Sequence, residues 1–177
     1  MRFNLPCLLP FTLAAAAYSN PSSNPSAPYL NSTSKTDVAS HINIQQKLAQ
    51  FELFVDSKNY TMLSDVFTPN ATFDPGAPTG PLNGFTAIKN WLQTSLVDTD
   101  TQHDFGTQYI DVHGQSASAV TYFVATFVGV GPKNGSMLVN HAKYLDTLEK
   151  SGDGVWRISN KTLIYMVSKA ITLVRLY

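Results

Sequence analysis

The sequence has very little cysteine and no excess of charge of either sign. Its 177 residues include a single cysteine, Cys7, and twelve basic residues balance twelve acidic ones. One cysteine excludes a disulfide framework, a zinc site built on cysteines and CxxC redox chemistry. A chain without net charge has no basic surface for nucleic acid and no polybasic segment for anionic lipid. We therefore expect no nucleic-acid partner.

Several catalytic and binding motifs are also missing. The chain has no GxSxG nucleophile motif, no glycine-rich phosphate loop and no HxH or HExxH metal spacing. What is present suits a folded domain, because 44% hydrophobic and 11% aromatic residues supply enough apolar surface for a core. We therefore expect a globular protein that uses neither a metal ion nor a cofactor.

Residues 1–17 predict a secretory signal peptide. Arg2 supplies the positive charge, an apolar stretch follows, and Ala15 and Ala17 form a small-residue cleavage site. The stretch is shorter than the roughly 20 apolar residues that cross a bilayer. We expect cleavage after Ala17, secretion, and no association with a membrane afterwards. Residues 18–36 are rich in Ser, Pro and Asn and predict a disordered linker ahead of a folded domain over residues 37–177.

Sequons for N-linked glycosylation support the extracellular assignment. The pattern N-x-S/T predicts glycosylation candidates at Asn31, Asn59, Asn70, Asn134 and Asn160.

The folded domain divides into a helical part and a strand-rich part. Apolar residues at helical spacing predict helices over residues 37–57, 60–67 and 85–97. Segments rich in Val, Tyr, Phe, Thr and Ile predict strands over residues 71–73, 105–112, 117–130, 136–149 and 155–167. Helices followed by an antiparallel meander indicate an α+β fold, with the helices on one face of a curled sheet.

One predicted strand bears on assembly. Residues 120–128 are apolar at both odd and even positions, so both faces of the strand favour burial. Helices cover only one face of a sheet. The other face is covered either in a homodimer, which is the simpler expectation, or by a sheet that curls onto its own tail.

Four strings carry a resemblance to a known family. FVDSKNYTMLSDVFTPNATFD, GFTAIKNWL, TQHDFG and DGVWRIS occur in this order within residues 42–165. They resemble the SnoaL-like families of the nuclear transport factor 2-like superfamily, which includes polyketide cyclases, ketosteroid isomerase and scytalone dehydratase. The resemblance implies a cone of curved, antiparallel sheet with a mixed edge, about three N-terminal helices and an enclosed pocket.

The resemblance also implies a function, although this fold hosts many chemistries. It implies a cofactor-independent lyase, isomerase or cyclase that transfers protons on polyketide-like or aromatic substrates. The alternative is a protein of the same fold that binds a ligand or mediates dimeric contacts without catalysis.

Site residues follow from the comparison with scytalone dehydratase. Asp56 and His103 resemble its hydrogen-bonded acid–base pair, and His141 lies near the position of a second histidine that faces the pocket. The two tyrosines that hold water in that enzyme are replaced by Val55 and Pro75. We therefore carry over the pocket and the Asp56–His103 pair, but not the specific dehydration.

The residues themselves leave two choices open. Glu52 lies one helical turn before Asp56 and is an alternative carboxylate for His103. Strand alternation places either His141 or Asn140 inward, and the pattern alone does not decide between them. A buried histidine beside a carboxylate would have a raised pKa and would serve as a general acid or base near neutral pH.

We expect the pocket to be strongly aromatic and suited to a small apolar or aromatic ligand. Simple alternation puts Phe105 and Tyr109 on the same face as His103, and Asn160 shares the inward parity of Trp156. Asn160 lines the pocket or carries a glycan, but not both. The predicted lining is Val55, Tyr60, Phe73, Trp91, Phe105, Tyr109 and Asn160.

Overall fold

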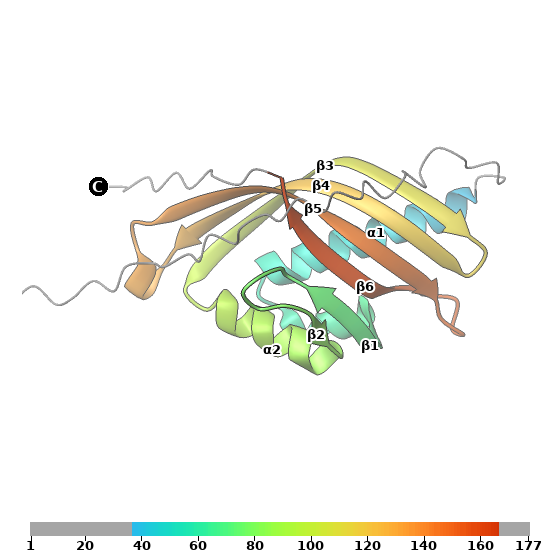
Figure 1. The fold of residues 1–177 in the computed structure, drawn as a ribbon, viewed down its shortest axis with the longest axis horizontal. Helices are drawn as coiled ribbons and strands as arrows, with labels where there is room; N and C mark the ends of the chain where they lie inside the picture. The colour runs from blue at the N-terminus through green and yellow to red at the C-terminus, as the bar shows by residue number, and fades with distance from the viewer. Residues whose placement is uncertain (1–36, 167–177) are drawn as a thin grey trace, which may run out of the picture.

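The computed structural model describes residues 37–166, so the predicted signal peptide, the linker and residues 167–177 lie outside the described residues. The elements follow in the order α1 (Val38–Asp56), the 3₁₀ helix η2 (Tyr60–Asp65), β1 (Phe67–Asp74), β2 (Leu82–Asn83), α2 (Phe85–Ser95), β3 (Thr99–His113), β4 (Ser116–Gly129), the short 3₁₀ helix η3 (Gly131–Lys133), β5 (Met137–Lys150) and β6 (Trp156–Tyr165) (Figure 1).

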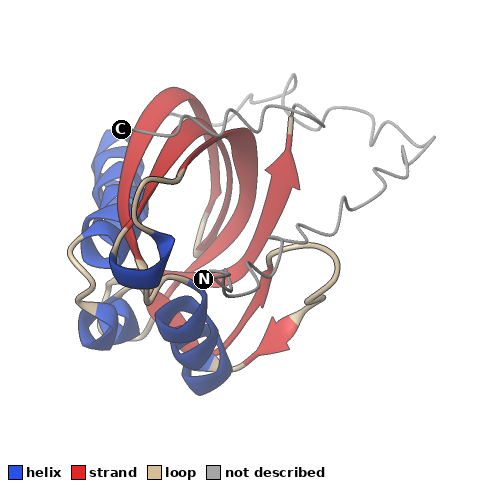
Figure 2. Ribbon diagram, turned by 90° about the vertical axis from the view of Figure 1, so that its left-hand side faces the viewer, coloured by secondary structure: helices blue, strands red, loops and turns tan. Residues whose placement is uncertain are grey.

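The six strands form one strongly curved sheet in the order β2-β1-β6-β5-β4-β3. Strands β3 to β6 make an antiparallel meander, whereas β1 pairs in parallel with β6 and antiparallel with β2. Figure 2 shows how the sheet curls and how the helices gather on one side of it. This arrangement confirms the predicted α+β cone with a mixed edge.

Helix α1 is set by its cap and by its apolar stripe. Asp37 caps the helix, because its Oδ1 accepts a hydrogen bond of 3.0 Å from the backbone N–H of Ser40. The apolar stripe of α1 consists of side chains that are at most 2% exposed: Ile44, Leu48, Phe51 and Val55. Phe51 makes edge-to-face contacts with aromatic rings of β1 and β5, so α1 packs into the concave side of the sheet.

Strand β3 begins six residues earlier than the sequence predicts. Residues 98–102 read as a polar linker, yet residues 99–104 continue the antiparallel ladder with the end of β4, where His103 pairs with Ala125. Their side chains alternate between half-buried and exposed. A polar strand escapes hydrophobic patterning, because its inner side chains face the end of α1 rather than the apolar core.

Two β-bulges reverse the inward and outward alternation within the sheet. In β3, three positions separate Phe105 from Gln108, whereas their partners on β4 are two positions apart. In β6, Ile158 and Asn160 pair with adjacent residues of β5. Each bulge inserts one extra residue, so the side chains beyond it change face.

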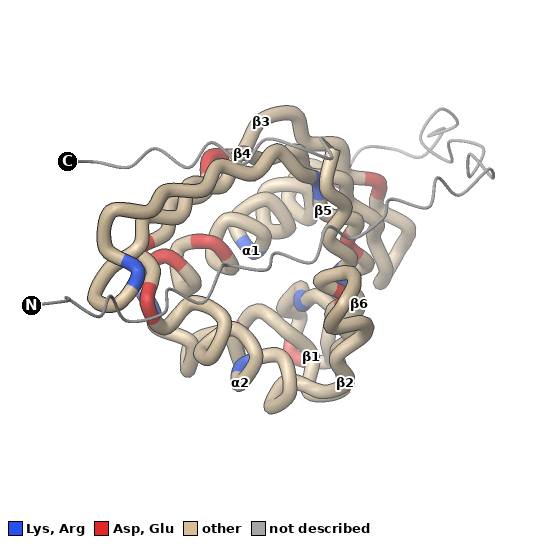
Figure 3. The backbone as a smooth tube through the Cα atoms, turned by 60° about the vertical axis from the view of Figure 1, so that its left-hand side comes forward, with Lys and Arg blue, Asp and Glu red and all other residues tan. Residues whose placement is uncertain are grey.

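The outer face of the sheet carries an exposed aromatic residue, and the charged residues are not concentrated on one element. Tyr122 on the outer face of β4 is 40% exposed, and the predicted homodimer stays a prediction. Figure 3 shows acidic and basic residues spread over several elements rather than gathered on one. Within residues 37–166, no helix combines the length and the apolar character needed to cross a bilayer.

Candidate functional site

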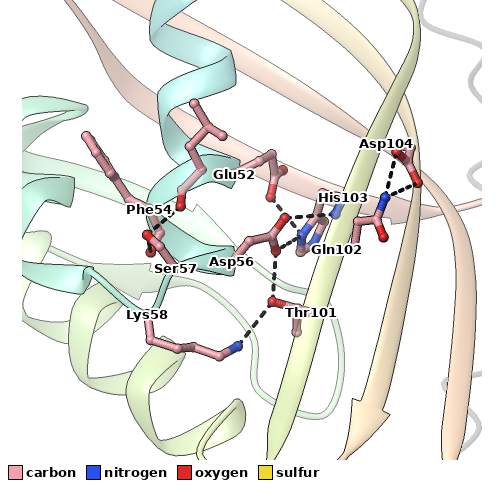
Figure 4. Close-up of polar contacts among 10 residues, drawn as sticks. Glu52, Phe54, Asp56, Ser57, Lys58, Thr101, Gln102, His103 and Asp104 are labelled. Carbon is pink, nitrogen blue, oxygen red and sulfur yellow. Dashed lines mark hydrogen bonds and ion pairs between the residues drawn. The ribbon is translucent and has the colours of Figure 1, made fainter.

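His103 on β3 lies against the last turn of α1, where Asp56 holds it from two sides (Figure 4). The ring Nδ1 is 2.7 Å from Asp56 Oδ1, and the backbone N–H of His103 donates to Oδ2 at 2.9 Å. Thr101, two residues earlier on β3, donates its hydroxyl to Oδ1 at 2.8 Å. The carboxylate therefore ties the end of α1 to β3 and orients the imidazole.

These contacts decide which ring nitrogen is free. With Asp56 accepting at Nδ1, the neutral imidazole carries its proton there, and Nε2 is left as the proton acceptor. The His103 side chain is only 6% exposed. Its ring lies 5.7 Å from the ring of Phe123 and 6.0 Å from that of Phe127. The site thus offers a basic nitrogen in apolar, aromatic surroundings.

Burial and hydrogen bonding oppose each other in both members of the pair. Burial alone would raise the pKa of Asp56, but the hydrogen bonds from His103 and Thr101 bring that pKa below its ordinary value. Burial alone would lower the pKa of His103, but the hydrogen bond to Asp56 and the charge of Glu52 raise it above the ordinary value. Each group is therefore held in its charged form more firmly than in water.

Glu52 joins this site as a second carboxyl group. It lies one turn before Asp56 on α1, its side chain is 6% exposed, and its Oε2 is 3.2 Å from His103 Nδ1. Burial raises its pKa to about 7, outweighing the nearby positive charges of His103 and Lys161. Besides His103, the hydroxyl of Tyr144 on β5 faces this carboxyl group, and both the burial of Tyr144 and the charge of Glu52 raise the pKa of that hydroxyl. The sequence left open whether Asp56 or Glu52 is the carboxylate beside His103. In the structure both lie beside it.

The sequence analysis missed a buried ion pair in the same interior. Lys161 Nζ on β6 lies 3.1 and 3.2 Å from the two carboxylate oxygens of Asp146 on β5, and both side chains are at most 1% exposed. The same amine lies 3.7 Å from the ring centroid of Tyr144 and 4.4 Å from that of Phe51. Asp146 had a detectable signal, since it shares strand parity with the apolar residues Ala142, Tyr144 and Leu148.

His141 does not belong to the site. It is exposed on the outer face of β5, because the alternation of this strand is fixed by its buried neighbours Ala142 and Tyr144. Asn140 therefore takes the inner parity, opposite the fully buried Ala125. The sequence allowed both parities, and the structure corrects the choice of His141.

The bulges correct two further pocket residues. Tyr109 follows the bulge in β3 and is 36% exposed on the outer face. Asn160 follows the bulge in β6 and is also exposed, with its side-chain amide donating to the hydroxyl of Thr72. The bulge instead turns Lys161 inward. Four of the predicted sequons are exposed, at Asn59, Asn70, Asn134 and Asn160, while Asn31 lies outside the described residues. Their glycosylation stays a prediction.

The remaining predicted lining residues lie in the interior to different degrees. Val55, Tyr60 and Phe73 are buried, and Trp91 and Phe105 are half-buried against the core. A cleft of about 360 Å³ is lined by Lys58, Tyr60, Gln93, Leu96, Val97, Thr99, Asp100 and Val130.

The cleft borders the Asp56–His103 pair. Lys58 donates from Nζ to Thr101 Oγ1 at 3.1 Å, and that hydroxyl in turn donates to Asp56. Tyr60 is the one predicted lining residue among those that line the cleft. Its hydroxyl is buried without a partner among residues 37–166. As for metals, no group of three or more His, Cys, Asp or Glu side chains in that part of the chain is arranged to hold an ion.

Comparison with known proteins agrees with this fold. The SnoaL-like domain family matches residues 36–162, and the chain belongs to that family. An uncharacterized protein of Mycobacterium tuberculosis is 29% identical over 126 residues, which are 71% of this chain and 84% of the relative.

Two solved structures are similar in fold. One is a nuclear transport factor 2-like superfamily protein from Salmonella enterica, with 19% identity, a TM-score of 0.65, and coverage of 76% of this chain and 97% of the other. The second is a candidate scytalone dehydratase from Novosphingobium aromaticivorans, with 18% identity, a TM-score of 0.66, and coverage of 78% and 93%.

Proposed function

We propose that this protein is a cofactor-independent enzyme that transfers protons on a small apolar or aromatic molecule, as a lyase, isomerase or cyclase. The observation that carries the proposal is the buried Asp56–His103 pair, with Nδ1 and Oδ1 2.7 Å apart. His103 Nε2 is the base. Asp56 fixes the tautomer and stabilises the imidazolium that forms when Nε2 takes a proton.

The surroundings of the pair support this reaction class. Rings of Phe123 and Phe127 flank the imidazole, so an apolar substrate would be desolvated there. The candidate scytalone dehydratase of the same fold is named for the removal of water from a small molecule. We further propose that the substrate is polyketide-like, that the enzyme acts as a homodimer, and that it acts outside the cell, the last on the basis of residues 1–17.

The base is tested first with a ketone that has no leaving group. Benzylacetone in D₂O exchanges the protons next to its carbonyl group when a base removes them, and proton NMR follows this exchange. We expect the wild-type protein to accelerate exchange at least about a hundredfold more than His103→Gln, since general base catalysis is typically worth about 10²–10⁴.

The ligand-binding alternative has its own outcome in this test. A wild type that binds benzylacetone, seen as shifted aromatic resonances, but exchanges its protons no faster than His103→Gln would contradict the enzymatic proposal. That result would establish a pocket protein without catalysis. His141→Asn, which changes an exposed histidine of β5, is the matched control and should exchange protons at the wild-type rate.

A further inference from the structure

The cleft beside the Asp56–His103 pair is lined by two hydrogen-bond donors whose capacity the chain does not use up. Tyr60 is 7% exposed, and its hydroxyl has no partner among residues 37–166. Lys58 Nζ donates to Thr101 Oγ1 at 3.1 Å and forms no ion pair with a carboxylate in the same part of the chain. An ammonium group has three N–H donors. A buried hydroxyl without a partner calls for an explanation, and a ligand that accepts its hydrogen bond is one.

The backbone at Lys58 is unusual as well. Lys58 follows the end of α1 with φ of 59°, and within residues 37–166 it is the only non-glycine residue with a positive φ. Its N–H donates to the carbonyl oxygen of Val55, and the N–H of Asn59 donates to that of Phe54. This is the Schellman arrangement of a helix end, in which glycine is the usual residue. Backbone conformation alone therefore favours glycine here, so the reason for a lysine lies in its side chain.

The rest of the cleft is suited to an apolar molecule of modest size. Leu96, Val97 and Val130 supply aliphatic side chains to its wall, and its volume is about 360 Å³. Small-molecule sites typically occupy roughly 300–1,000 Å³ and combine such apolar walls with a few convergent polar groups. Lys58 and Tyr60 are two polar groups of that kind.

The charges around the cleft leave Lys58 incompletely compensated. Burial lowers the pKa of Lys58, and the negative charges of Asp56 and Asp100 oppose this only in part. Asp100 also lines the cleft, but it is exposed, so solvent screens its charge. A ligand that brings its own negative charge to Lys58 would improve this balance.

We propose that the cleft binds the carboxylate group of a small organic acid whose remaining surface is apolar. The ammonium of Lys58 and the hydroxyl of Tyr60 donate to the carboxylate, and the apolar part of the molecule contacts Leu96, Val97 and Val130. A carboxylate fits because both available groups are donors, whereas an ionised carboxylate is an acceptor only. This inference goes beyond the proposed function, because it involves no proton transfer.

One chain of hydrogen bonds joins the cleft to His103 (Figure 4). Lys58 donates to Thr101, Thr101 donates to Asp56, and Asp56 lies 2.7 Å from the imidazole Nδ1 of His103. Thr99, which lines the cleft, has the same strand parity as Thr101 and His103. The bound carboxylate is therefore either the remote end of the substrate or part of a separate acid that binds next to it.

The first experiment compares an acid with its uncharged counterpart. Isothermal titration calorimetry measures the binding of 3-phenylpropionate and of 3-phenylpropionamide. We expect wild type to bind the acid at least about tenfold more tightly than the amide. Lys58→Met should lose this preference and bind the amide within about threefold of wild type, since a hydrogen bond to a charged group is typically worth a factor of ten or more. Lys143→Met removes the same charge from the outer face of β5 and should match wild type with both probes.

Tyr60→Phe tests the second donor. Both probes carry an oxygen that accepts from the Tyr60 hydroxyl, so we expect the variant to bind each of them at least about threefold more weakly. Without a ligand the variant should unfold at the same or a higher urea concentration than wild type, because the hydroxyl that it removes is unpaired. Unchanged binding of both probes by Tyr60→Phe would overturn the proposal.

Lys58→Gly separates binding from a structural role of the lysine. Glycine adopts a positive φ without strain, so the variant should unfold at a higher urea concentration than wild type. Its affinity for 3-phenylpropionate should nevertheless fall as far as that of Lys58→Met. A variant that unfolds more readily and binds the acid as wild type does would overturn the proposal, because Lys58 would then serve only to hold Thr101.

The remaining outcomes are separable. A wild type that binds no 3-phenylpropionate, or binds acid and amide equally, would overturn the proposal. Displacement of bound benzylacetone by 3-phenylpropionate supports a carboxylate on the substrate itself, and simultaneous binding of both supports a separate acid. Absence of any benzylacetone binding or exchange contradicts the proposed function instead, and the comparison of acid with amide still decides whether the cleft binds a carboxylate.

Discussion

The interior of the cone contains two clusters of buried polar side chains. They differ in how completely their charges and hydrogen-bonding atoms are paired. Asp146 and Lys161 form an ion pair in which both carboxylate oxygens accept from one amine, itself placed against two aromatic rings. The cluster around His103 has two carboxyl groups for one imidazole, whose Nδ1 lies 2.7 Å from Asp56 and 3.2 Å from Glu52. The ion pair is complete and has the properties of a structural element. In the cluster, two carboxyl groups share one imidazole, so its charges are less evenly matched than those of the ion pair.

The largest expected effect is on the ion pair. Asp146→Ala leaves the charge of Lys161 buried without a partner, and we expect the free energy of unfolding to fall by about 3–5 kcal/mol, measured by urea denaturation. The double variant Asp146→Leu, Lys161→Met removes both charges and should recover most of this loss. A loss below about 1 kcal/mol for Asp146→Ala would break the comparison, because the pair would then contribute nothing to the fold.

Unlike the Asp146–Lys161 ion pair, Glu52 should lower the free energy of unfolding at neutral pH. Its pKa rises from 4.5 in water to about 7 in the folded protein, so the folded state binds its proton more tightly than the unfolded state does. Its contribution to stability is complete below pH 4.5 and is lost as the pH rises through about 7. At about 1.4 kcal/mol for each pKa unit, the loss is about 3 kcal/mol.

Glu52→Gln removes this dependence on pH. Relative to wild type, the variant should gain about 3 kcal/mol in the free energy of unfolding between pH 4.5 and pH 7.5. Urea denaturation of both proteins across this range measures the difference. Parallel pH profiles would show that Glu52 is as satisfied as the ion pair, and the contrast between the two groups would disappear.

Asp56→Asn tests whether Asp56 sets the pKa of His103. The asparagine keeps the shape of the side chain but loses the charge that the imidazolium needs, so the raised pKa of His103 should fall. We expect a smaller loss of stability than for Asp146→Ala, about 1–2 kcal/mol, because an amide oxygen still accepts hydrogen bonds. Proton NMR of the His103 ring measures the pKa, and an unchanged value would mean that Asp56 does not set it.

The smallest effect is expected on the convex side of the sheet. His141→Asn should change the free energy of unfolding by less than about 0.5 kcal/mol, since the residue is exposed on β5. The titration of His103 should be the same as in wild type. A change in that titration would place His141 back within reach of the site, contrary to the parity of its strand.

How much the sequence could predict depends on what interrupts its periodicity. The stripe of α1 and the chain order of the elements predicted the helix and the α+β class, because those patterns are continuous, whereas the cone followed from the family resemblance. The Asp56–His103 pair followed from the resemblance to scytalone dehydratase, and its placement was not disturbed because Asp56 closes an uninterrupted helix and His103 precedes the first bulge.

The errors arise where one inserted residue changes the parity of a strand. Tyr109 and Asn160 each follow a bulge, and single-sequence alternation carries no sign of the extra residue. The bulge in β6 also explains why the sequence analysis missed Lys161, because simple alternation places its side chain on the outer face. The choice of His141 over Asn140 was wrong for a different reason. The two residues are adjacent and similar in polarity, so alternation alone does not show which of them faces inward.

The parallel pairing of β1 with β6 sets the order in which the molecule can be completed. Residues 67–74 are made early, yet their sheet neighbours, residues 156–165, are among the last of the fold to be synthesised. Until β6 exists, β1 can pair only with the two residues of β2, and Asp146 lacks the amine that neutralises it. Contacts so distant along the chain slow folding and favour cooperative closure. During translation, therefore, the Asp146–Lys161 ion pair and the β1 edge of the sheet form only after the final strand has been synthesised.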